Sequence, residues 1–443
     1  MKILKFGGTS VGSAQRMKDV VKLIVSEETK IVVLSAMSGT TNSLVEISDY
    51  FYHKNTAGAL EHINILEKKY YDVASELVNT QKYTTKANEI IKERFTYIRS
   101  FSTAVFTVFE EKAILAQGEL LSTLLFQLYL QELGVDSVLL PALDFMRIDK
   151  NSEPDTAFIA ENLAKQLAEN PNHQLYITQG YICRNFYGEI DNLQRGGSDY
   201  TASLIGAAAN ADEIQIWTDI DGMHDNDPRY VEGTHPVPFL HFEEAAELAY
   251  FGAKILHPTC ILPAKLNNIP VRLLNTMQPD AHGTLISMQS KKNSVQAVAA
   301  KDGITAIKIK SGRMLLAYGF LRKVFEVFES YQTAIDMITT SEVGVSVTID
   351  NTKNLDEILN ELKKLGTVTV DADLVIICVV GDIPGDNVGM TAIAVDALKQ
   401  IPIRMISYGG SNYNISFLVK SADKVKALNA LSNNLFNMSE RQK

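Results

Sequence analysis

The sequence has 443 residues, of which 42 are Lys or Arg and 52 are Asp or Glu, so its formal net charge at neutral pH is −10. This acidic balance argues against binding to nucleic acid, because phosphate backbones are bound by clustered cationic side chains. The hydrophobic share of 46% and the charged share of 21% are ordinary for a globular protein and exclude collagen-like, disordered and coiled-coil chains. At about 150 residues per domain, the length predicts roughly three domains.

No apolar run approaches the roughly 18 to 20 residues that a membrane-spanning helix needs, so we predict no membrane association. Even residues 374–381, among the most apolar of the chain, form far too short a run. The N-terminus has no apolar segment of the signal-peptide type. The three cysteines, Cys183, Cys260 and Cys378, are far apart and lack metal-ligand spacing. These features predict a cytoplasmic protein whose cysteines are small buried hydrophobic residues.

The first region, up to about residue 290, alternates short apolar strands with amphipathic helices, which is typical of an α/β layer structure. Residues 31–34 form a continuous apolar run, the pattern of a parallel strand covered on both faces. We predict one large domain over residues 1–290. Its predicted strands are 2–6, 31–34, 137–140, 175–178, 213–218 and 271–274, with mostly helical structure from 44 to 133.

The second region, beyond a polar stretch around 287–294, consists of two copies of a smaller unit. Residues 335–339 (Ile-Asp-Met-Ile-Thr) match residues 403–407 (Ile-Arg-Met-Ile-Ser). Each match follows a predicted helix and precedes a strand with alternating apolar residues. The element order predicts ferredoxin-like βαββαβ units at 311–372 and 373–443.

The count of strands predicts that the second copy is discontinuous. The first copy can be assembled with strands at 313–317, 335–339, 343–349 and 367–370. The second copy has strands at 374–380, 403–407 and 413–418, and its last helix, 422–436, is not followed by a fourth strand. The unassigned strand at 304–309 can fill that place, so we predict that residues 303–310 complete the second copy.

Glycines mark a candidate phosphate site near the N-terminus. Gly7-Gly8-Thr9-Ser10 separates a predicted strand from a helix, where backbone N–H groups and the positive end of a helix dipole favour phosphate. The segment lacks the Lys of a Walker A motif, and no G-x-G-x-x-G fingerprint is present. A plain tight turn is the alternative on spacing alone. Lys5 favours the phosphate interpretation, because it is placed to reach the same loop from the end of the strand.

Two further segments carry charge at predicted ends of strands or helices. Residues 195–201 (Arg-Gly-Gly-Ser-Asp-Tyr-Thr) precede a helix of small residues, and the guanidinium of Arg195 suits a carboxylate or phosphate. A helix capped by Ser198 or Asp199 is the alternative, and both interpretations can hold together. The acidic loop 218–229 does not follow the EF-hand order, so a nucleotide-contacting loop at the carboxyl edge of a parallel sheet is favoured.

Three other positions have ordinary default interpretations. Glu119 is by default a solvated helix residue. Lys254 interrupts an apolar segment, where a lone cation is costly without an anionic partner. His224 and His257 offer no metal-ligand pattern, and we predict no metal site built from side chains.

Taken in order, these segments resemble the aspartokinases of the amino-acid kinase superfamily, and the resemblance covers essentially the whole chain. The matching motifs are Lys5–Val11, Arg195–Thr201, Thr218-Asp219, Asp227–Arg229, Phe251–Lys254 and His257-Pro258. The resemblance implies an amino-acid kinase fold, a mainly parallel sheet sandwiched by helices, followed by two ferredoxin-like ACT domains. It also implies that MgATP phosphorylates the β-carboxylate of L-aspartate, giving 4-phospho-L-aspartate for lysine, threonine and methionine synthesis.

The implied reaction needs no general base, because a carboxylate with a pKa near 3.9 is already ionised at neutral pH. The site must instead hold two anions in line and neutralise charge on the moving phosphoryl group. This chemistry favours Lys5 and Lys254 as catalytic residues that stabilise the phosphoryl group. The resemblance implies Asp199 as a third catalytic residue, which orients groups or helps to organise Mg²⁺, and Thr41, Glu119 and Arg195 as aspartate ligands. The predicted nucleotide ligands are Lys5, Gly7, Gly8, Thr218, Asp219, His224, Arg229 and Lys254, with Mg²⁺ held mainly through the phosphates.

The effector segment resembles that of the lysine-inhibited, monofunctional type. The implied effector residues are Met314, Gly319, Phe320, Leu321, Asp336, Thr340, Ser341, Glu342 and Val343. Two positions depart from the family pattern: His224 replaces a tyrosine of the nucleotide loop, and Ala317 replaces a serine that can bind effector. Inhibition by L-lysine is therefore predicted to be weaker, or the effector to be different. The ACT pair also implies a homo-oligomer, a dimer or tetramer, because edge strands of two chains can pair.

Two other function classes compete with this hypothesis. A different amino-acid kinase would use glutamate, acetylglutamate or carbamate, but the Arg195 loop, Glu119 and the two ACT copies argue against it. A non-catalytic amino-acid sensor would be expected to have lost Lys5, Asp199 or Lys254, and all three are present. Both alternatives are therefore disfavoured.

Overall fold

The computed structural model describes residues 1–103, 105–193, 196–252, 256–289, 291–312, 318–384 and 389–436. These residues form two compact units, the first made of residues 1–223 and 255–288 and the second of residues 224–254 and 289–443. The segment 224–254, which lies inside the predicted first domain, is thus part of the second unit. The domain limits given above remain a prediction.

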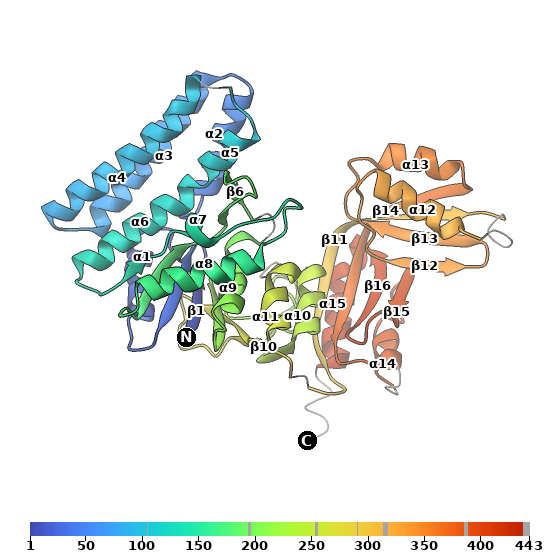
Figure 1. The fold of residues 1–443 in the computed structure, drawn as a ribbon. Helices are drawn as coiled ribbons and strands as arrows, with labels where there is room; N and C mark the ends of the chain where they lie inside the picture. The colour runs from blue at the N-terminus through green and yellow to red at the C-terminus, as the bar shows by residue number, and fades with distance from the viewer. Residues whose placement is uncertain are drawn as a thin grey trace. The chain divides into compact units, whose positions relative to one another are not determined.

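The first unit contains a mainly parallel sheet with helices on its faces (Figure 1). Within this unit, the strands lie in the order β3-β4-β2-β1-β7-β9-β10, and only the β9–β10 pair is antiparallel among the described pairs of this sheet. The strands are β1 (Lys2–Phe6), β2 (Lys30–Leu34), β3 (Val138–Leu139), β4 (Leu175–Gln179), β7 (Glu213–Thr218), β9 (Val271–Asn275) and β10 (Thr284–Ser287), and β5 (Ile182–Arg184) and β6 (Ile190–Asn192) form a separate hairpin. The helices are α1 (Ala14–Ile24), α2 (Thr40–Tyr52), α3 (Thr56–Leu77), α4 (Gln81–Ser100), α5 (Val108–Leu115), α6 (Gln117–Glu132), α7 (Ala142–Phe145), α8 (Thr156–Glu169), α9 (Gly197–Ala208) and α11 (Leu262–Leu266).

The alternation of side chains along the central strand β1 divides the core between the two faces of the sheet. Leu4 and Phe6 belong to a large cluster built with α1, α2, α3, α4 and α6. Ile3 faces the other side, where a Cβ on Gly206 of α9 would lie 3.7 Å from the Ile3 side chain. Strand β2 is buried along its whole length, as its continuous apolar run predicts.

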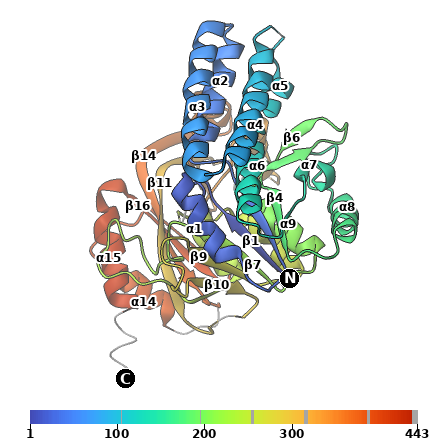
Figure 2. The same ribbon diagram turned by 90° about the vertical axis from the view of Figure 1, so that its left-hand side faces the viewer.

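Helices α3 and α4 form a long antiparallel pair beside α2 in the first unit (Figure 2). The combined segment Val108–Glu132 of α5 and α6 is long and apolar enough to cross a membrane, so the prediction that no such run exists is wrong. However, 83% of its most apolar window is buried inside the fold. Because most of it is buried, the segment is a core element of this unit.

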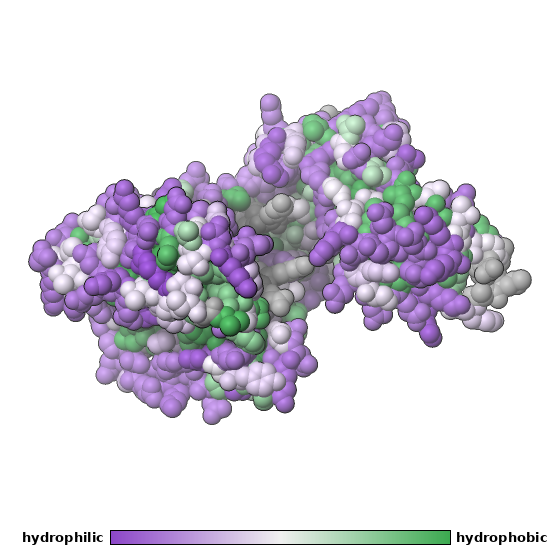
Figure 3. Space-filling model, turned by 90° about the horizontal axis from the view of Figure 1, so that it is seen from above, coloured by the Kyte–Doolittle hydropathy of each residue, from purple (hydrophilic) through white to green (hydrophobic). Residues whose placement is uncertain are grey.

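On the face shown in Figure 3, hydrophilic residues cover most of the surface and hydrophobic ones form scattered spots.

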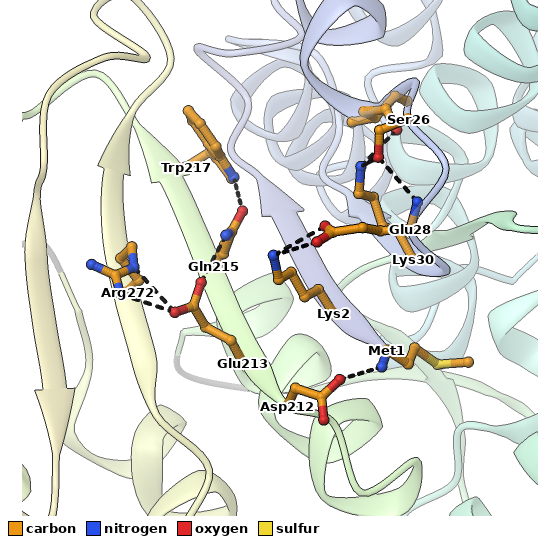
Figure 4. A network of polar contacts seen from close by, with 11 residues as sticks. Met1, Lys2, Ser26, Glu28, Lys30, Asp212, Glu213, Gln215, Trp217 and Arg272 are labelled. Carbon is orange, nitrogen blue, oxygen red and sulfur yellow. Dashed lines mark hydrogen bonds and ion pairs between the residues drawn. The ribbon is translucent and has the colours of Figure 1, made fainter.

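Charged side chains tie the amino ends of the central strands together (Figure 4). Lys2 of β1 pairs with Glu28 at 3.0 Å, and Arg272 of β9 pairs with Glu213 of β7 at 3.1 Å. The amino group of Met1 bonds Asp212 in the turn before β7. These pairs lie at the edge of the sheet opposite the carboxyl ends of the strands, so they support the fold and leave the carboxyl edge free for a site.

The second unit contains a sheet in the order β12-β13-β11-β14-β16-β15. Its helices bury apolar stripes, such as Phe320, Val324 and Phe328, against the strands. The elements are β8 (Phe239–His241), α10 (Phe242–Tyr250), β11 (Val295–Lys310), α12 (Phe320–Ser330), β12 (Ile338–Ser341), β13 (Gly344–Ile349), α13 (Leu355–Lys363), β14 (Thr367–Gly381), α14 (Met390–Ala397), β15 (Met405–Tyr408), β16 (Asn414–Lys420) and α15 (Lys424–Leu435).

The strand pairing corrects the predicted assembly of the two copies. Residues 305–310 of β11 pair with β13, and residues 306–310 pair on their other side with residues 367–371 of β14, so both neighbours belong to the first copy and the prediction that residues 303–310 complete the second copy is wrong. Residues 295–301 of the same strand pair with residues 376–381 of β14. The predicted strands 367–370 and 374–380 form one continuous strand, β14, with a register shift near Asp373, whose φ of 57° is left-handed. The predicted strand 313–317 lies outside the described residues.

Candidate active site

An ion pair joins the end of β1 to the first turn of α9. Because side chains alternate along a strand, Lys5 faces the same side of the sheet as Ile3, where α9 packs. Its Nζ lies 2.7 Å from Oδ1 of Asp199, and the two side chains are only 12% and 15% exposed. A Cβ on Gly7 would lie 3.4 Å from the same Nζ. Lys5 therefore does lie beside the glycine loop, as the sequence predicts.

The glycine loop is held against the loop that follows β2. A Cβ on Gly8 would lie 2.9 Å from the carbonyl oxygen of Ala36, closer than real side chains come. The N–H of Ser38 donates to the carbonyl of Gly8 at 3.1 Å. The loop ends at Ser13, whose hydroxyl caps α1 by accepting from the N–H of Arg16. Glycine at position 8 is thus required by close approach of two backbones.

These loops form one wall of a cleft of about 360 Å³ at the carboxyl ends of the strands. In open α/β sheets, ligands bind outside the carboxyl ends of the strands, and this cleft lies at the ends of β1, β2 and β4. Most of the lining residues gave no signal in the sequence, because few of them are charged. The cleft is lined by Gly8, Ser35, Ala36, Met37, Ser38, Gly39, Thr41, Asn42, Glu119, Tyr181 and Ser198.

Glu119 lies in the first turn of α6 and is 4% exposed, so its default interpretation as a solvated residue is wrong. Its Oε1 accepts a hydrogen bond from the N–H of Ala36 at 3.2 Å. Its Oε2 is buried and has no hydrogen-bond partner among the described residues. Burial raises the pKa of Glu119 to about 8. A buried carboxylate with an unpartnered oxygen in a cleft is suited to bind an ammonium group.

Tyr181 and Ser198 also line the cleft. Tyr181 has a left-handed φ of 67°, and its N–H donates to the hydroxyl of Thr201 at 2.9 Å. The hydroxyl of Ser198 accepts from that of Ser35 at 2.9 Å, which links α9 to the β2 loop. A strained residue at a cleft is a common feature of functional sites. Sequence reasoning had no signal for Tyr181, since its conformation depends on tertiary contacts.

Gly180 leaves no room for a side chain beside α9. A Cβ there would lie 2.4 Å from the Cβ and Oγ of Ser198 and 2.9 Å from its Cα. Gly180→Ala is therefore expected to push the first turn of α9, with Asp199, away from the sheet and lower kcat/KM at least about tenfold. Steady-state kinetics check this, with Gly410→Ala as the control because a Cβ there meets nothing within 4 Å. Unchanged kinetics for Gly180→Ala would show that the position of this turn is not critical.

The predicted nucleotide residues divide between the two units. Thr218 ends β7, the neighbour of β1, and Asp219 follows it; the Thr218 carbonyl accepts from the N–H of Thr276 at 2.8 Å. The buried hydroxyls of Ser10 and Thr276 lie 2.7 Å apart, which connects the glycine loop to the end of β9. The structure therefore gathers the loops after β1, β7 and β9 at one edge.

The other two predicted nucleotide residues, His224 and Arg229, belong to the second unit. There, Nδ1 of His224 lies 3.1 Å from the hydroxyl of Thr234. The exposed Arg229 forms an ion pair with Asp227 at 2.6 Å. Their predicted contact with nucleotide stays a prediction.

Three predicted residues, Arg195, Lys254 and Met314, lie outside the described residues. The alternative that Ser198 or Asp199 caps α9 is wrong, since Gly196 occupies the N-cap position with a φ of 73°. In the described part of the chain, no group of three or more His, Cys, Asp or Glu side chains is arranged to hold a metal ion.

Among the predicted effector residues that the structure describes in the second unit, Asp336 lies apart from those at the far end of β12. Asp336 lies just before β12, and Ser341 ends that strand, so the two are about 16 Å apart along an extended segment. The buried carboxylate of Asp336 accepts from Nζ of Lys301 at 2.6 Å and from the hydroxyl of Tyr250 at 2.8 Å. The other effector residues with described positions lie near the opposite end of β12 or at the start of α12; these are Gly319, Phe320, Leu321, Thr340, Ser341, Glu342 and Val343.

Comparison with known proteins assigns both parts of the chain. The amino acid kinase family matches residues 1–275, and an ACT domain matches residues 377–435. The chain is 34% identical to lysine-sensitive aspartokinase 3 of Escherichia coli strain K12, over 98% of this chain and 99% of that protein. It is also 34% identical to chloroplastic aspartokinase 1 of Arabidopsis thaliana, over 98% of this chain and 80% of that protein.

Solved structures agree with the sequence comparison. The crystal structure of E. coli aspartokinase III with aspartate and ADP, in its R-state, superposes with a TM-score of 0.83 at 32% identity, covering 98% of this chain and all of that one. The T-state of the same enzyme with lysine and aspartate gives a TM-score of 0.81 at 33% identity, covering 98% of this chain and 99% of that one. The chain therefore belongs to the amino acid kinase family, as an aspartokinase with a C-terminal ACT region.

Proposed function

We propose that this aspartokinase phosphorylates the β-carboxylate of L-aspartate in the cleft between the glycine loop, the β2 loop and α6. The observation that carries this assignment is the pairing of Lys5 with Asp199 beside a cleft in which Glu119 presents an unpartnered oxygen. Lys5, next to the glycine loop that borders the cleft, thus offers a cation for phosphate, and Glu119 in the cleft wall offers an anion for the α-ammonium of the substrate. The homologous E. coli enzyme binds aspartate and ADP in its R-state structure, which supports the same pair of ligand classes here.

The proposed roles of the residues combine the family resemblance with the surroundings of those that the structure describes. Asp199 holds the ammonium of Lys5 at the end of β1 and so fixes the position from which Lys5 neutralises a transferring phosphoryl group. Glu119 binds the α-ammonium, and Thr41, on the rim of the cleft, contacts a carboxylate of aspartate. Arg195 and Lys254 complete the anion site in this proposal. Thr218, Asp219, Gly7 and Gly8 line the nucleotide, with Mg²⁺ held through the phosphates.

Regulation by L-lysine is the second part of the proposal. It is supported by the likeness to the lysine-sensitive E. coli enzyme, whose T-state structure contains lysine. The ACT pair would form the effector site together with a second copy, since the predicted effector residues are spread along β12 and α12 within one chain. The location in the cytoplasm also stays part of the proposal, as the relatives include chloroplastic enzymes.

A hydroxylamine assay tests both parts. Purified protein with MgATP and L-aspartate is expected to give a hydroxamate, because an acyl phosphate reacts with hydroxylamine. L-glutamate in place of aspartate is expected to give none, and addition of L-lysine to lower the yield from aspartate. If L-lysine does not change the yield, the effector assignment is contradicted and the assignment of the enzymatic activity stands. Yield with glutamate and none with aspartate would contradict the substrate assignment.

A further inference from the structure

The loop after β2, residues 35–41, forms much of the wall of the cleft, and its position depends on supports from both sides. On the inner side, the carbonyl of Ser35 accepts from the hydroxyl of Ser122 at 2.7 Å, and the N–H of Ala36 donates to Glu119. The loop then turns through Gly39, whose φ is 79°, into α2. No side chain caps this helix at Gly39, so the conformation of the turn must be fixed by other contacts.

Two neighbouring residues of α3 supply those contacts from the outer side. The ammonium of Lys69 donates to the carbonyl of Ser38 at 2.6 Å. The hydroxyls of Tyr70 and Thr40 lie 3.1 Å apart, and both residues are fully buried. The Tyr70 ring also packs edge-on against Phe95 of α4, with the ring centroids 5.8 Å apart. The α3–α4 pair thus holds the turn at two successive points.

The positive charge of Lys69 also acts on the cleft, in addition to the hydrogen bond that its ammonium donates to Ser38. Its ammonium is half-buried, burial lowers its pKa, and it forms no ion pair with a carboxylate among the described residues. It lies 3.7 Å from where a Cβ of Gly39 would be, at the start of α2. A cation there adds to the positive end of the α2 dipole, next to Thr41 and the cleft. Since this partly buried cation has no carboxylate partner among the described residues, an anion bound in the cleft would stabilise it.

We infer that Lys69 and Tyr70 are positioning residues for the aspartate site, which act by holding the Ser38–Thr41 turn against the cleft. The inference rests on the proposed function of that cleft. Neither side chain lines the cleft, so both act through the turn. The anchored turn keeps Thr41 and the start of α2 in place for a dicarboxylate. In the hydrogen bonds that the structure describes, the nucleotide loops after β1 and β7 contact neither Lys69 nor Tyr70.

The test compares Lys69→Met with Lys68→Met, which removes the adjacent exposed lysine of the same helix. Lys69→Met is expected to raise KM for L-aspartate about tenfold, because misplacement of substrate-positioning groups by a fraction of an ångström lowers efficiency at this scale. KM for ATP and the melting temperature should stay near those of Lys68→Met. Lys69→Arg should restore most of the affinity, since a guanidinium can donate to the same carbonyl and keeps the charge.

Tyr70→Phe is a second, independent variant, because it removes one hydroxyl and keeps the packing against Phe95. It is expected to raise KM for L-aspartate and leave KM for ATP unchanged. Equal KM values for Lys69→Met, Tyr70→Phe and Lys68→Met would overturn the inference, as would a parallel rise of both KM values with a lower melting temperature. If the unmodified protein forms no acyl phosphate from aspartate, it is the proposed function that fails, so the two failures are distinguishable.

Discussion

Lys5→Met is expected to lower kcat by about 10²–10³, the usual cost of removing one preorganised group that stabilises transition-state charge. The variant keeps the length and apolar stem of the side chain and loses the ammonium that lies 2.7 Å from Asp199. Steady-state kinetics with saturating MgATP and aspartate measure the effect. KM for aspartate should change much less than kcat, because the proposed contact of Lys5 is with the phosphoryl group.

Lys2→Met is the matched control, since Lys2 lies at the amino end of the same strand and pairs with Glu28 (Figure 4). An exposed pair of this kind contributes little to stability and lies at the opposite end of the strand from the cleft, so kcat should be unchanged. Lys5→Met leaves the Asp199 carboxylate without its partner. Asp199→Asn and the double variant with Lys5→Met therefore show whether a lower kcat comes from the missing ammonium or from this unpaired carboxylate. If the two residues act as one unit, the double variant should be about as slow as Lys5→Met alone. A kcat for Lys5→Met within twofold of Lys2→Met would exclude Lys5 from the chemistry.

Glu119→Gln is expected to raise KM for L-aspartate by about 10- to 100-fold, since a hydrogen bond to a charged group contributes about 1.5–3 kcal/mol. The amide is isosteric but cannot pair with the α-ammonium as a carboxylate does. Glu89→Gln on the exposed side of α4 is the control and should leave KM unchanged. An unchanged KM for Glu119→Gln would remove Glu119 from the substrate site.

The same residue predicts a pH dependence of substrate binding. Burial raises the pKa of Glu119 to about 8 in the free protein, so below that pH the carboxyl group is mostly neutral. Only the ionised form pairs with ammonium, so kcat/KM for aspartate should rise as pH increases from 6 to about 8, by up to about tenfold per unit. Glu119→Gln should abolish the rise. A profile that is flat in the unmodified protein between pH 6 and 8 would contradict this assignment.

Local patterns were sufficient to predict the strands that are central to the first unit. Residues 213–218 form β7 with the predicted bounds, and residues 31–34 lie within a strand buried along its length. The continuous strand β14 was predicted as two strands, because the register shift near Asp373 interrupts the alternation without ending the pairing. Which partner a strand such as β11 chooses depends on contacts far apart in sequence, and periodicity does not contain that information.

The charged residues of the site were easier to predict than its walls. Lys5 and Asp199 stand in glycine-rich motifs at predicted strand and helix ends, and the structure brings them together. The burial of Glu119 follows from α6 packing inside the core, which a local pattern cannot show. Tyr181 gave no signal, because it lacks an unusual neighbour pattern and its left-handed φ arises from tertiary contacts.

The most direct test of the central claim identifies which carboxylate is phosphorylated. Purified protein is incubated with MgATP, hydroxylamine and L-aspartate labelled with ¹³C at C4, and the hydroxamate is examined by NMR spectroscopy. The proposed function predicts that the label appears in the hydroxamate carbonyl, as aspartate β-hydroxamate, and that Lys5→Met gives little of it. A product with an unlabelled hydroxamate carbonyl, or none from folded protein, would contradict it.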